Sequence, residues 1–293
     1  YHGWHDWYLA ANLQNSKNLD TQLLPGLNAK GVSKSYRGSI KPFNYNDISS
    51  LKKIFSNKKN NVGVVIMEPM RAVKPSKNFL KEVKKITKKN NAVLIFDEIT
   101  SGFKDNYGGI HLKLNTKPDM AIFGKSIGNG YPISAIIGKK NIMQVAQDTF
   151  ISSTMWTDRL GFIAANATLN KLKKLKVNNK IKNFGKKIKK GWIELAKKNY
   201  LKITVTGLDT IPSFKFNYPN NLEISTYFTQ EMLAKGFLAN TTLTTSLSFN
   251  DKIIEDYLNE VDKVFYKINH NLKNNSFLLK GDIKHSTFKR LTG

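Results

Sequence analysis

Two short stretches of the sequence contain residue types that could do chemistry. The stretch LIFDEITSGFK, residues 94–104, brings Asp97 and Glu98 to the end of an apolar run. The stretch FGKSIGNGYPISA, residues 123–135, places Lys125 among glycines. A lysine amine can form a Schiff base with an aldehyde, and a buried carboxylate can hold a ring nitrogen in its protonated state. Asp97 and Lys125 are therefore candidate catalytic residues, provided that the fold brings them together.

Predicted strands and a helix between them would position these residues. Apolar runs at 62–67 and 92–96 predict strands that are buried on both faces, and the segment between them has the apolar periodicity of a helix. This βαβ pattern predicts parallel strands with a right-handed crossover. Glu68, Asp97 and Lys125 each follow the end of a predicted strand. Ligands of open parallel sheets bind beyond those ends, so the three residues mark a candidate site.

Pyridoxal phosphate offers both chemical groups that these residues could engage. Its aldehyde can join the Lys125 amine, and its pyridine ring withdraws electrons when a carboxylate such as Asp97 keeps the ring nitrogen protonated. The glycines around Lys125 allow the backbone to turn sharply and to approach a ligand closely. Each feature alone is common in proteins. Their occurrence together at strand ends favours a pyridoxal phosphate site.

The remainder of the chain predicts a second, smaller domain. A long helical stretch at about 161–200 is followed by alternating runs at 201–207 and 211–217, and then by two amphipathic helices. Such alternation is typical of an antiparallel sheet with one face in water. We therefore predict an α/β protein. Its large domain, with a mostly parallel sheet, would cover 1–176, and a small α+β domain would cover 177–293.

The chain is strongly basic, with 47 Lys and Arg against 21 Asp and Glu and a formal net charge of +26. A nucleic acid or an anionic membrane surface would match such a charge. The lysines are spread along the chain, however. In the densest stretch they fill the helical face opposite Ile181, Phe184, Ile188, Trp192 and Leu195. The pattern favours solvated helix faces, and a basic nucleic-acid-binding protein without enzymatic activity is the weaker alternative.

The composition bears on several other classes of protein. The sequence has no cysteine, which excludes disulfides and thiolate metal sites, and its start lacks the pattern of a signal peptide. No apolar run is long enough to span a bilayer, so we predict a cytoplasmic protein. His2, His5 and Asp6 are close in sequence, but an aromatic stretch of this kind favours packing over a metal site, and we predict no metal.

Several motifs occur in an order and at spacings that are similar to those of a known family. The motifs are YHGWHDW at the start, MEP at 67–69, FDEITSGFK at 96–104, PDMAIFGKSIGNGYPISAIIG at 118–138 and SSTMWTDRLGFIAANATL at 152–169. Together they resemble class III pyridoxal-phosphate aminotransferases, in particular the branch of the glutamate-1-semialdehyde aminomutases. The resemblance implies fold type I of the pyridoxal-phosphate-dependent transferases, with pyridoxal 5'-phosphate as the cofactor.

The resemblance also implies roles for individual residues. Asp97 would be the partner of the pyridinium nitrogen, and Lys125 would be the Schiff-base lysine. Ile99 would pack against one face of the cofactor ring. Tyr1 and His2 would both lie at the cofactor, with Tyr1 stacked on the other face of the ring.

Two further implications concern the assembly and the extent of the chain. Thr154 would reach the cofactor phosphate of the neighbouring subunit, which implies a homodimer with its sites at the interface. The Gly/Ser/Thr-rich phosphate-binding turn of the family, at a helix N-terminus, would precede Tyr1. We therefore expect the sequence to be an N-terminally truncated piece of a longer protein.

The predicted reaction is amino-group transfer between a small-molecule amino donor and a carbonyl acceptor. Lys125 would hold the cofactor as a Schiff base and then, once displaced, move a proton between substrate and cofactor. An intramolecular aminomutase of the glutamate-1-semialdehyde type uses the same steps on one carbon skeleton. The sequence leaves both reactions open and does not identify the substrates.

Overall fold

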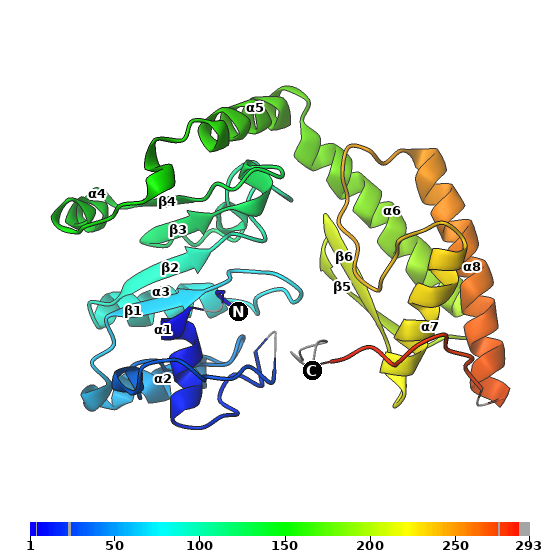
Figure 1. Cartoon of the computed structure of the whole chain (residues 1–293), viewed down its shortest axis with the longest axis horizontal. Helices are drawn as coiled ribbons and strands as arrows, with labels where there is room; N and C mark the ends of the chain where they lie inside the picture. The colour runs from blue at the N-terminus through cyan, green and yellow to red at the C-terminus, as the bar shows by residue number, and fades with distance from the viewer. Residues whose placement is uncertain (4, 23–24, 275, 287–293) are drawn as a thin grey trace. The chain divides into compact units, whose positions relative to one another are not determined.

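The computed structural model, drawn in Figure 1, describes residues 1–3, 5–22, 25–274 and 276–286. The chain divides into two compact units. The first unit contains Tyr1–Met67 and Pro75–Asp97, together with the described residues from His285 onward. The second unit contains Glu68–Lys74 and Glu98–Lys284. Each unit has an apolar core of its own.

The first unit contains a parallel pair of strands. β1 (Val64–Met67) and β2 (Val93–Asp97) pair in parallel, with Val65 opposite Leu94. The connection between them contains α3 (Phe79–Lys89), which buries the apolar side of the helix. The βαβ unit predicted from the apolar runs is therefore confirmed, and Asp97 is the last residue of its second strand.

The described remainder of the first unit combines short helices with turns and irregular segments. Tyr8, Leu9 and Leu19 belong to a small apolar core, and Tyr1 packs against it. The start of the chain is thereby fixed to a structured part of the unit. The helices are α1 (Asp6–Leu9), η1 (Ala10–Leu13), η2 (Lys34–Tyr36), α2 (Ile48–Ser56) and η3 (Lys58–Asn60).

The second unit contains an antiparallel pair of strands. β3 (Met120–Phe123) pairs with β4 (Ala135–Gly138), and Phe123 lies opposite Ala135. The connection at 124–134 holds only the short η5 (Lys125–Ile127), whereas a parallel pair would need a longer crossover. Lys125 therefore lies directly after β3, in the connection between two antiparallel strands.

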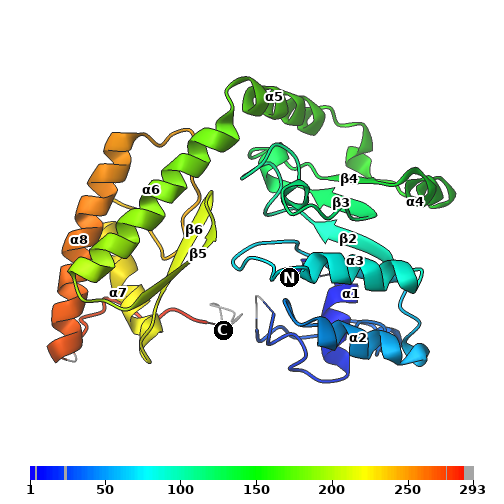
Figure 2. The same cartoon turned by 180° about the vertical axis from the view of Figure 1, so that it is seen from behind.

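The C-terminal part of the second unit is an antiparallel sheet of two strands covered by helices (Figure 2). The strands are β5 (Ile203–Leu208) and β6 (Ile211–Phe216), and the helices are α6 (Val177–Lys198), α7 (Asn221–Ala234) and α8 (Asp251–Asn274). These elements confirm the alternating and amphipathic patterns that the sequence shows in this region.

The predicted domain boundary at 176/177 lies inside the second unit, between α5 (Leu160–Lys174) and α6, and stays a prediction. The shorter helices of this unit precede α5 in the chain. They are η4 (Ile110–Leu112), α4 (Lys140–Met143), η6 (Gln144–Asp148) and η7 (Thr154–Thr157).

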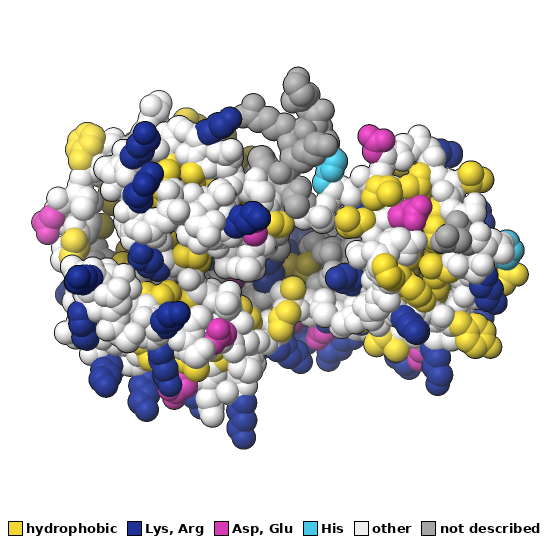
Figure 3. Space-filling model, turned by 90° about the horizontal axis from the view of Figure 1, so that it is seen from below, with side chains coloured by type: hydrophobic (Ala, Val, Ile, Leu, Met, Phe, Trp, Pro, Cys, Tyr) yellow, Lys and Arg dark blue, Asp and Glu magenta, His cyan; other side chains and the backbone are white. Residues whose placement is uncertain are grey.

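The lysines of the long helices lie on their solvent faces. On α6, Ile188 and Trp192 are buried, whereas Lys187 and Lys190 are exposed. Lys187 pairs with Asp251 at 2.6 Å, an exposed ion pair of a kind that contributes little stability. On the face that Figure 3 shows, Lys and Arg side chains are spread over the surface, with a few acidic side chains among them. The predicted amphipathic face of this helix is confirmed.

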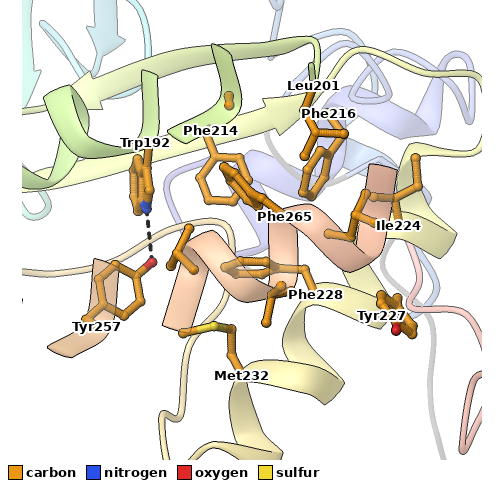
Figure 4. Close-up of a cluster of buried hydrophobic side chains, with 14 of the residues drawn as sticks. Trp192, Leu201, Phe214, Phe216, Ile224, Tyr227, Phe228, Met232, Tyr257 and Phe265 are labelled. Carbon is orange, nitrogen blue, oxygen red and sulfur yellow. Dashed lines mark hydrogen bonds between the residues drawn. The ribbon is translucent and has the colours of Figure 1, made fainter. Parts of the chain in front are cut away.

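Aromatic rings fill the core between β5–β6 and the covering helices (Figure 4). The Phe214 ring meets Trp192 at 4.7 Å and Phe228 at 5.4 Å between centroids, both edge to face. Such pairs contribute about 1 kcal/mol each beyond the area they bury. Trp192 Nε1 donates a hydrogen bond to the Tyr257 hydroxyl at 3.1 Å. Burial raises the pKa of that hydroxyl, so it stays protonated and this core stays uncharged.

Candidate active site

Asp97 is a buried carboxylate at the end of β2 in the first unit. It is 5% exposed, and its Oδ2 lies 2.7 Å from Nδ1 of His2. The His2 ring lies against the rings of Trp7 and Tyr8, with centroids 6.0 and 6.1 Å away. A buried carboxylate needs polar partners of this kind, and the aromatic contacts fix the direction from which His2 reaches it. The structure therefore brings two predicted site residues, His2 and Asp97, into contact.

Tyr1 belongs to the same aromatic group. Its ring meets Tyr8 edge to face, with centroids 5.7 Å apart, and it is partly buried against the core of the first unit. Tyr1 and His2 thus both contact Tyr8, and His2 in turn contacts the carboxylate of Asp97.

Lys125 lies in the second unit with its side chain exposed. Its backbone φ is +44°, a left-handed value that is uncommon for a residue other than glycine. Its Nζ donates a hydrogen bond to Oγ1 of Thr100 at 2.8 Å. The preceding Gly124 lies against Ile99, whose Cγ atoms are 3.6 Å from the place where a Cβ would stand. Ile99, Thr100 and Lys125 therefore form one group.

Glycines shape the turn that follows Lys125. A Cβ on Gly128 would overlap the carbonyl oxygen of Tyr131, and Asn129 and Gly130 adopt φ values of +47° and +108°. The sharp turn that the sequence GNG predicts is present. It returns the chain toward β4 a few residues after Lys125.

Glu98 is fully buried and braces the loop that follows β2. Its Oε2 accepts hydrogen bonds from the Ser101 hydroxyl and from the backbone N–H of Ile110, the latter at 3.0 Å. Its Oε1 accepts from the backbone N–H of His111 at 2.9 Å and lies 2.8 Å from the ring Nδ1 of the same residue. A Cβ on Gly109 would overlap this arrangement, so glycine is required there. The carboxylates of Asp97 and Glu98 are adjacent in sequence but have different partners. The Glu98 carboxylate stabilises the loop.

Lys104 is a second cation near Lys125. Burial lowers the pKa of its amine, the positive charge of Lys125 lowers it further, and the charge of Asp105 opposes both effects in part. The backbone around it is held by Asn178, whose amide donates to the carbonyl oxygens of Phe103 at 2.9 Å and of Lys104 itself. The loop therefore holds a partly buried ammonium within electrostatic reach of Lys125.

Two residues that the sequence singled out have other surroundings. Glu68 forms an ion pair with Arg71, with Oε1 and Nη1 3.4 Å apart. Thr154 is exposed at the start of η7, and in the described part of the chain it makes no hydrogen bond to Lys125. Thr100 is a further residue of the group around Lys125, and no motif of the sequence marks it as such. A hydroxyl three residues beyond Asp97 was visible in the sequence, but only the fold shows that Lys125 is its partner.

Taken each within its own unit, these side chains offer groups of the kind that pyridoxal phosphate needs. Lys125 offers an exposed amine for the aldehyde, Asp97 a buried carboxylate for the ring nitrogen and Ile99 an apolar side chain for a ring face. In the described ranges, no three His, Cys, Asp or Glu side chains are grouped as metal ligands would be. None of the described helices combines the length and the apolar character needed to cross a bilayer.

Comparison with known proteins assigns the family. The model of the aminotransferase class-III family matches residues 1–267. The chain belongs to this family. Class III aminotransferases depend on pyridoxal phosphate, which agrees with the residues described above and confirms the predicted family and cofactor class.

Two curated relatives illustrate the range of reactions among similar sequences. A 3-aminobutyryl-CoA aminotransferase of Cloacimonas acidaminovorans is 29% identical over 223 residues, which are 74% of this chain and 50% of that protein. A glutamate-1-semialdehyde 2,1-aminomutase of Thermosipho melanesiensis is 35% identical over 204 residues, which are 67% of this chain and 45% of that protein. The chain spans about half the length of these relatives.

Solved structures establish the fold. The internal-aldimine form of the FumI protein of Sphingopyxis sp. MTA144 is similar with a TM-score of 0.78 at 19% identity, over 92% of this chain and 69% of that one. An omega-transaminase of Sphaerobacter thermophilus gives the same TM-score at 18% identity, over 92% and 67%. The predicted α/β fold of the pyridoxal-phosphate-dependent transferases, fold type I, is confirmed.

Proposed function

We propose that this chain binds pyridoxal phosphate through Lys125 and catalyses amino-group transfer between a small amino donor and a carbonyl acceptor. The observation that carries the proposal is the exposed Lys125 amine, held beside Thr100 and Ile99 in a chain of this family. When bound, the cofactor supplies the aldehyde that receives the amine and a ring that withdraws electrons from the bonds of the substrate.

The side chains of this protein would supply orientation and proton movement. Asp97 would face the ring nitrogen and keep it protonated, and His2 would orient Asp97 through the 2.7 Å contact. Lys125 would move a proton between the α-carbon of the substrate and the carbon that comes from the cofactor aldehyde. Asp97 and Lys125 belong to different units, each described by itself, so their meeting in one site is part of the proposal.

Reduction with borohydride in the presence of pyridoxal phosphate tests the role of Lys125. We expect peptide mapping to find the reduced cofactor on Lys125, and Lys125→Ala to lose both the attachment and nearly all turnover. Lys139→Ala is the matched control, because the Lys139 side chain is also exposed and pairs with Asp119 on the surface. Attachment to another lysine, or a loss of attachment in the control variant alone, would overturn the assignment.

An intramolecular aminomutase is the second candidate reaction. The curated relative that is 35% identical over 204 residues is a glutamate-1-semialdehyde 2,1-aminomutase, and this similarity supports the second candidate. Supplying glutamate-1-semialdehyde without a second substrate separates the two reactions. Its conversion to an isomer would indicate the mutase, whereas a need for a separate donor and acceptor would indicate the transferase.

We also propose a homodimer in which each Thr154 serves the site of the other subunit. Apolar side chains gather on the exposed stretch at 145–163, and an exposed apolar patch of this kind marks an interaction surface. Phe150 is 98% exposed and Trp156 is 62% exposed, on either side of Thr154 in the sequence. The other apolar members are Val145, Ile151, Met155, Leu160, Phe162 and Ile163.

Two further parts of the proposal come from the sequence alone. We propose that residues 1–176 form the large domain that holds the cofactor and that residues 177–293 form the small domain. We also propose a cytoplasmic location and an interaction with small molecules rather than with nucleic acid. The solvent-exposed lysines of α6 support the proposal that nucleic acid is not a partner. Their positions follow from the amphipathic character of the helix, so no bound polyanion is needed to explain them.

A further inference from the structure

Thr100 is a buried residue whose hydroxyl oxygen receives a hydrogen bond from the candidate catalytic amine. The residue is 8% exposed, and its Oγ1 lies 2.8 Å from Nζ of Lys125. The Lys125 side chain is exposed and ends a flexible stem that would otherwise sample many rotamers. A fixed acceptor at hydrogen-bond distance selects one of those rotamers.

The turn that carries Thr100 is fixed on its inner side by Glu98. The Glu98 carboxylate receives four polar contacts from Ser101, Ile110 and His111, as described above, and none of the Glu98 surface is exposed. Glu98 lies two residues before Thr100 and Ser101 one residue after it. Their hydrogen bond therefore fixes the backbone on both sides of Thr100. Thr100 has little freedom to move away from Lys125.

The backbone fixes the same turn to the strand that precedes Lys125. The N–H of Glu98 donates to the carbonyl oxygen of Ile122 in β3 at 2.8 Å, and the carbonyl oxygen of Glu98 accepts from the N–H of Gly102 at 2.7 Å. Ile122 is three residues before Lys125. Donor and acceptor of the Thr100–Lys125 hydrogen bond are therefore both tied to β3.

We propose that Thr100 is a positioning residue for Lys125: its hydroxyl holds the amine in one orientation whenever the amine is not joined to the cofactor. This inference rests on the proposed role of Lys125 and adds to it the residue that sets the direction of the amine. An amine held in this hydrogen bond must leave it before its nitrogen can attack another group. Thr100 would thus restrain the reactivity of Lys125 as well as its orientation.

Competitive acetylation of the 293-residue chain without cofactor tests this inference. The chain is treated with limiting acetic anhydride at neutral pH, and the acetylation of Lys125 is measured by mass spectrometry relative to that of Lys139. We expect Thr100→Val to raise the relative acetylation of Lys125 about three- to tenfold. This factor is the net free energy of one hydrogen bond, converted to the change in the population of free amine. Thr100→Ser keeps the hydroxyl, so we expect the wild-type ratio.

Thr87→Val is the matched control. Its hydroxyl is buried and donates to the carbonyl oxygen of Lys84 within α3, so the substitution makes the same chemical change in the other unit. We expect it to leave the ratio for Lys125 unchanged. A Thr100→Val chain that melts at a lower temperature but keeps the wild-type ratio would show a purely structural role and overturn the inference, as would a Thr100→Ser chain that behaves like Thr100→Val.

The result of the acetylation experiment can be distinguished from the result of the cofactor-attachment experiment that tests the proposed function. Acetylation is measured without pyridoxal phosphate, whereas the role of Lys125 is tested by reduction with it. A failure of the cofactor to attach to Lys125 would leave the acetylation ratios unchanged, and wild-type ratios in Thr100→Val would leave the attachment unchanged.

Discussion

Asp97 combines burial with a partner that keeps its direction fixed. Its Oδ2 lies 2.7 Å from His2 Nδ1, and the residue is 5% exposed. Asp97→Asn has nearly the same shape and keeps an oxygen for His2, so we expect the fold to be retained. The neutral amide cannot hold a ring nitrogen protonated, and we expect the half-reaction with an amino donor to slow by about a hundredfold or more. Rapid mixing with the donor measures the rate. A rate near that of the wild type would remove Asp97 from the proposed site.

Lys104 carries a charge that the fold disfavours. Burial and the Lys125 charge lower the pKa of its amine below the usual 10.5. Below the lowered pKa the folded chain must hold a charged Lys104 at a cost in stability. That cost disappears as the pH rises from the lowered pKa to 10.5, because the unfolded chain then also loses the proton.

Lys104→Met removes this cost and keeps a side chain of similar length. We expect the melting temperature at pH 7 to rise by on the order of 2 °C, and the gain to shrink as the pH approaches 10.5. Lys180→Met on the exposed face of α6 is the control and should leave the melting temperature unchanged. A lower melting temperature for Lys104→Met at pH 7 would show that the ammonium stabilises the loop instead.

At the scale of elements, two glycines of α6 look alike in the sequence and differ in the fold. Both are buried in the middle of a long helix, where alanine is favoured over glycine by about 1 kcal/mol. A Cβ on Gly185 would overlap the backbone carbonyl of Asp209, which cannot yield easily. A Cβ on Gly191 would instead meet the side-chain end of Leu258 at 2.6 Å, which can shift.

We therefore expect Gly185→Ala and Gly191→Ala to differ in the free energy of unfolding. Gly185→Ala should lose about 2 kcal/mol or more through overpacking against backbone. Gly191→Ala should stay within about 1 kcal/mol of the wild type, because the gain in helix propensity offsets the shift of Leu258. Urea denaturation followed by circular dichroism measures both. Equal losses would show that the turn at Asp209 adapts as readily as a side chain.

Helices and strands that a local pattern of apolar residues defines could be predicted from the sequence. Contacts between residues that are distant in the sequence could not. The apolar runs of β1 and β2 and the periodicity of α3 and α6 are properties of neighbouring residues, and the structure confirms them. The contact between Thr100 and Lys125 joins residues 25 positions apart, and the Asn178 amide reaches a loop more than 70 positions away. No local pattern contains these pairs. The family motifs singled out Asp97 and Lys125, whereas the hydrogen-bond partners through which Glu98 supports the loop required the fold.

At the scale of the whole molecule, the chain spans about half the length of its curated relatives and exposes the apolar stretch at 145–163 around Thr154. In a dimer with two-fold symmetry, a residue near the interface can serve the site of the other subunit. The proposed homodimer, in which Thr154 serves the site of the other subunit, predicts that two inactive variants restore activity when they are mixed. Thr154→Ala and Lys125→Ala chains should each have little activity alone, because each lacks one component of every site.

Mixing the two variants would create hybrid dimers in which one site has both Lys125 and Thr154 intact. Random pairing makes half of the dimers hybrid, and each hybrid has one complete site, so we expect recovery of about a quarter of wild-type turnover. The mixture is refolded together from urea, and turnover is compared with that of each variant refolded alone. The control mixes Lys125→Ala with Asp97→Asn, whose residues we propose to serve one site from the same chain. Both mixtures recovering equally would indicate that Asp97 also acts across the interface, and no recovery with Thr154→Ala would show that Thr154 serves its own subunit or no site.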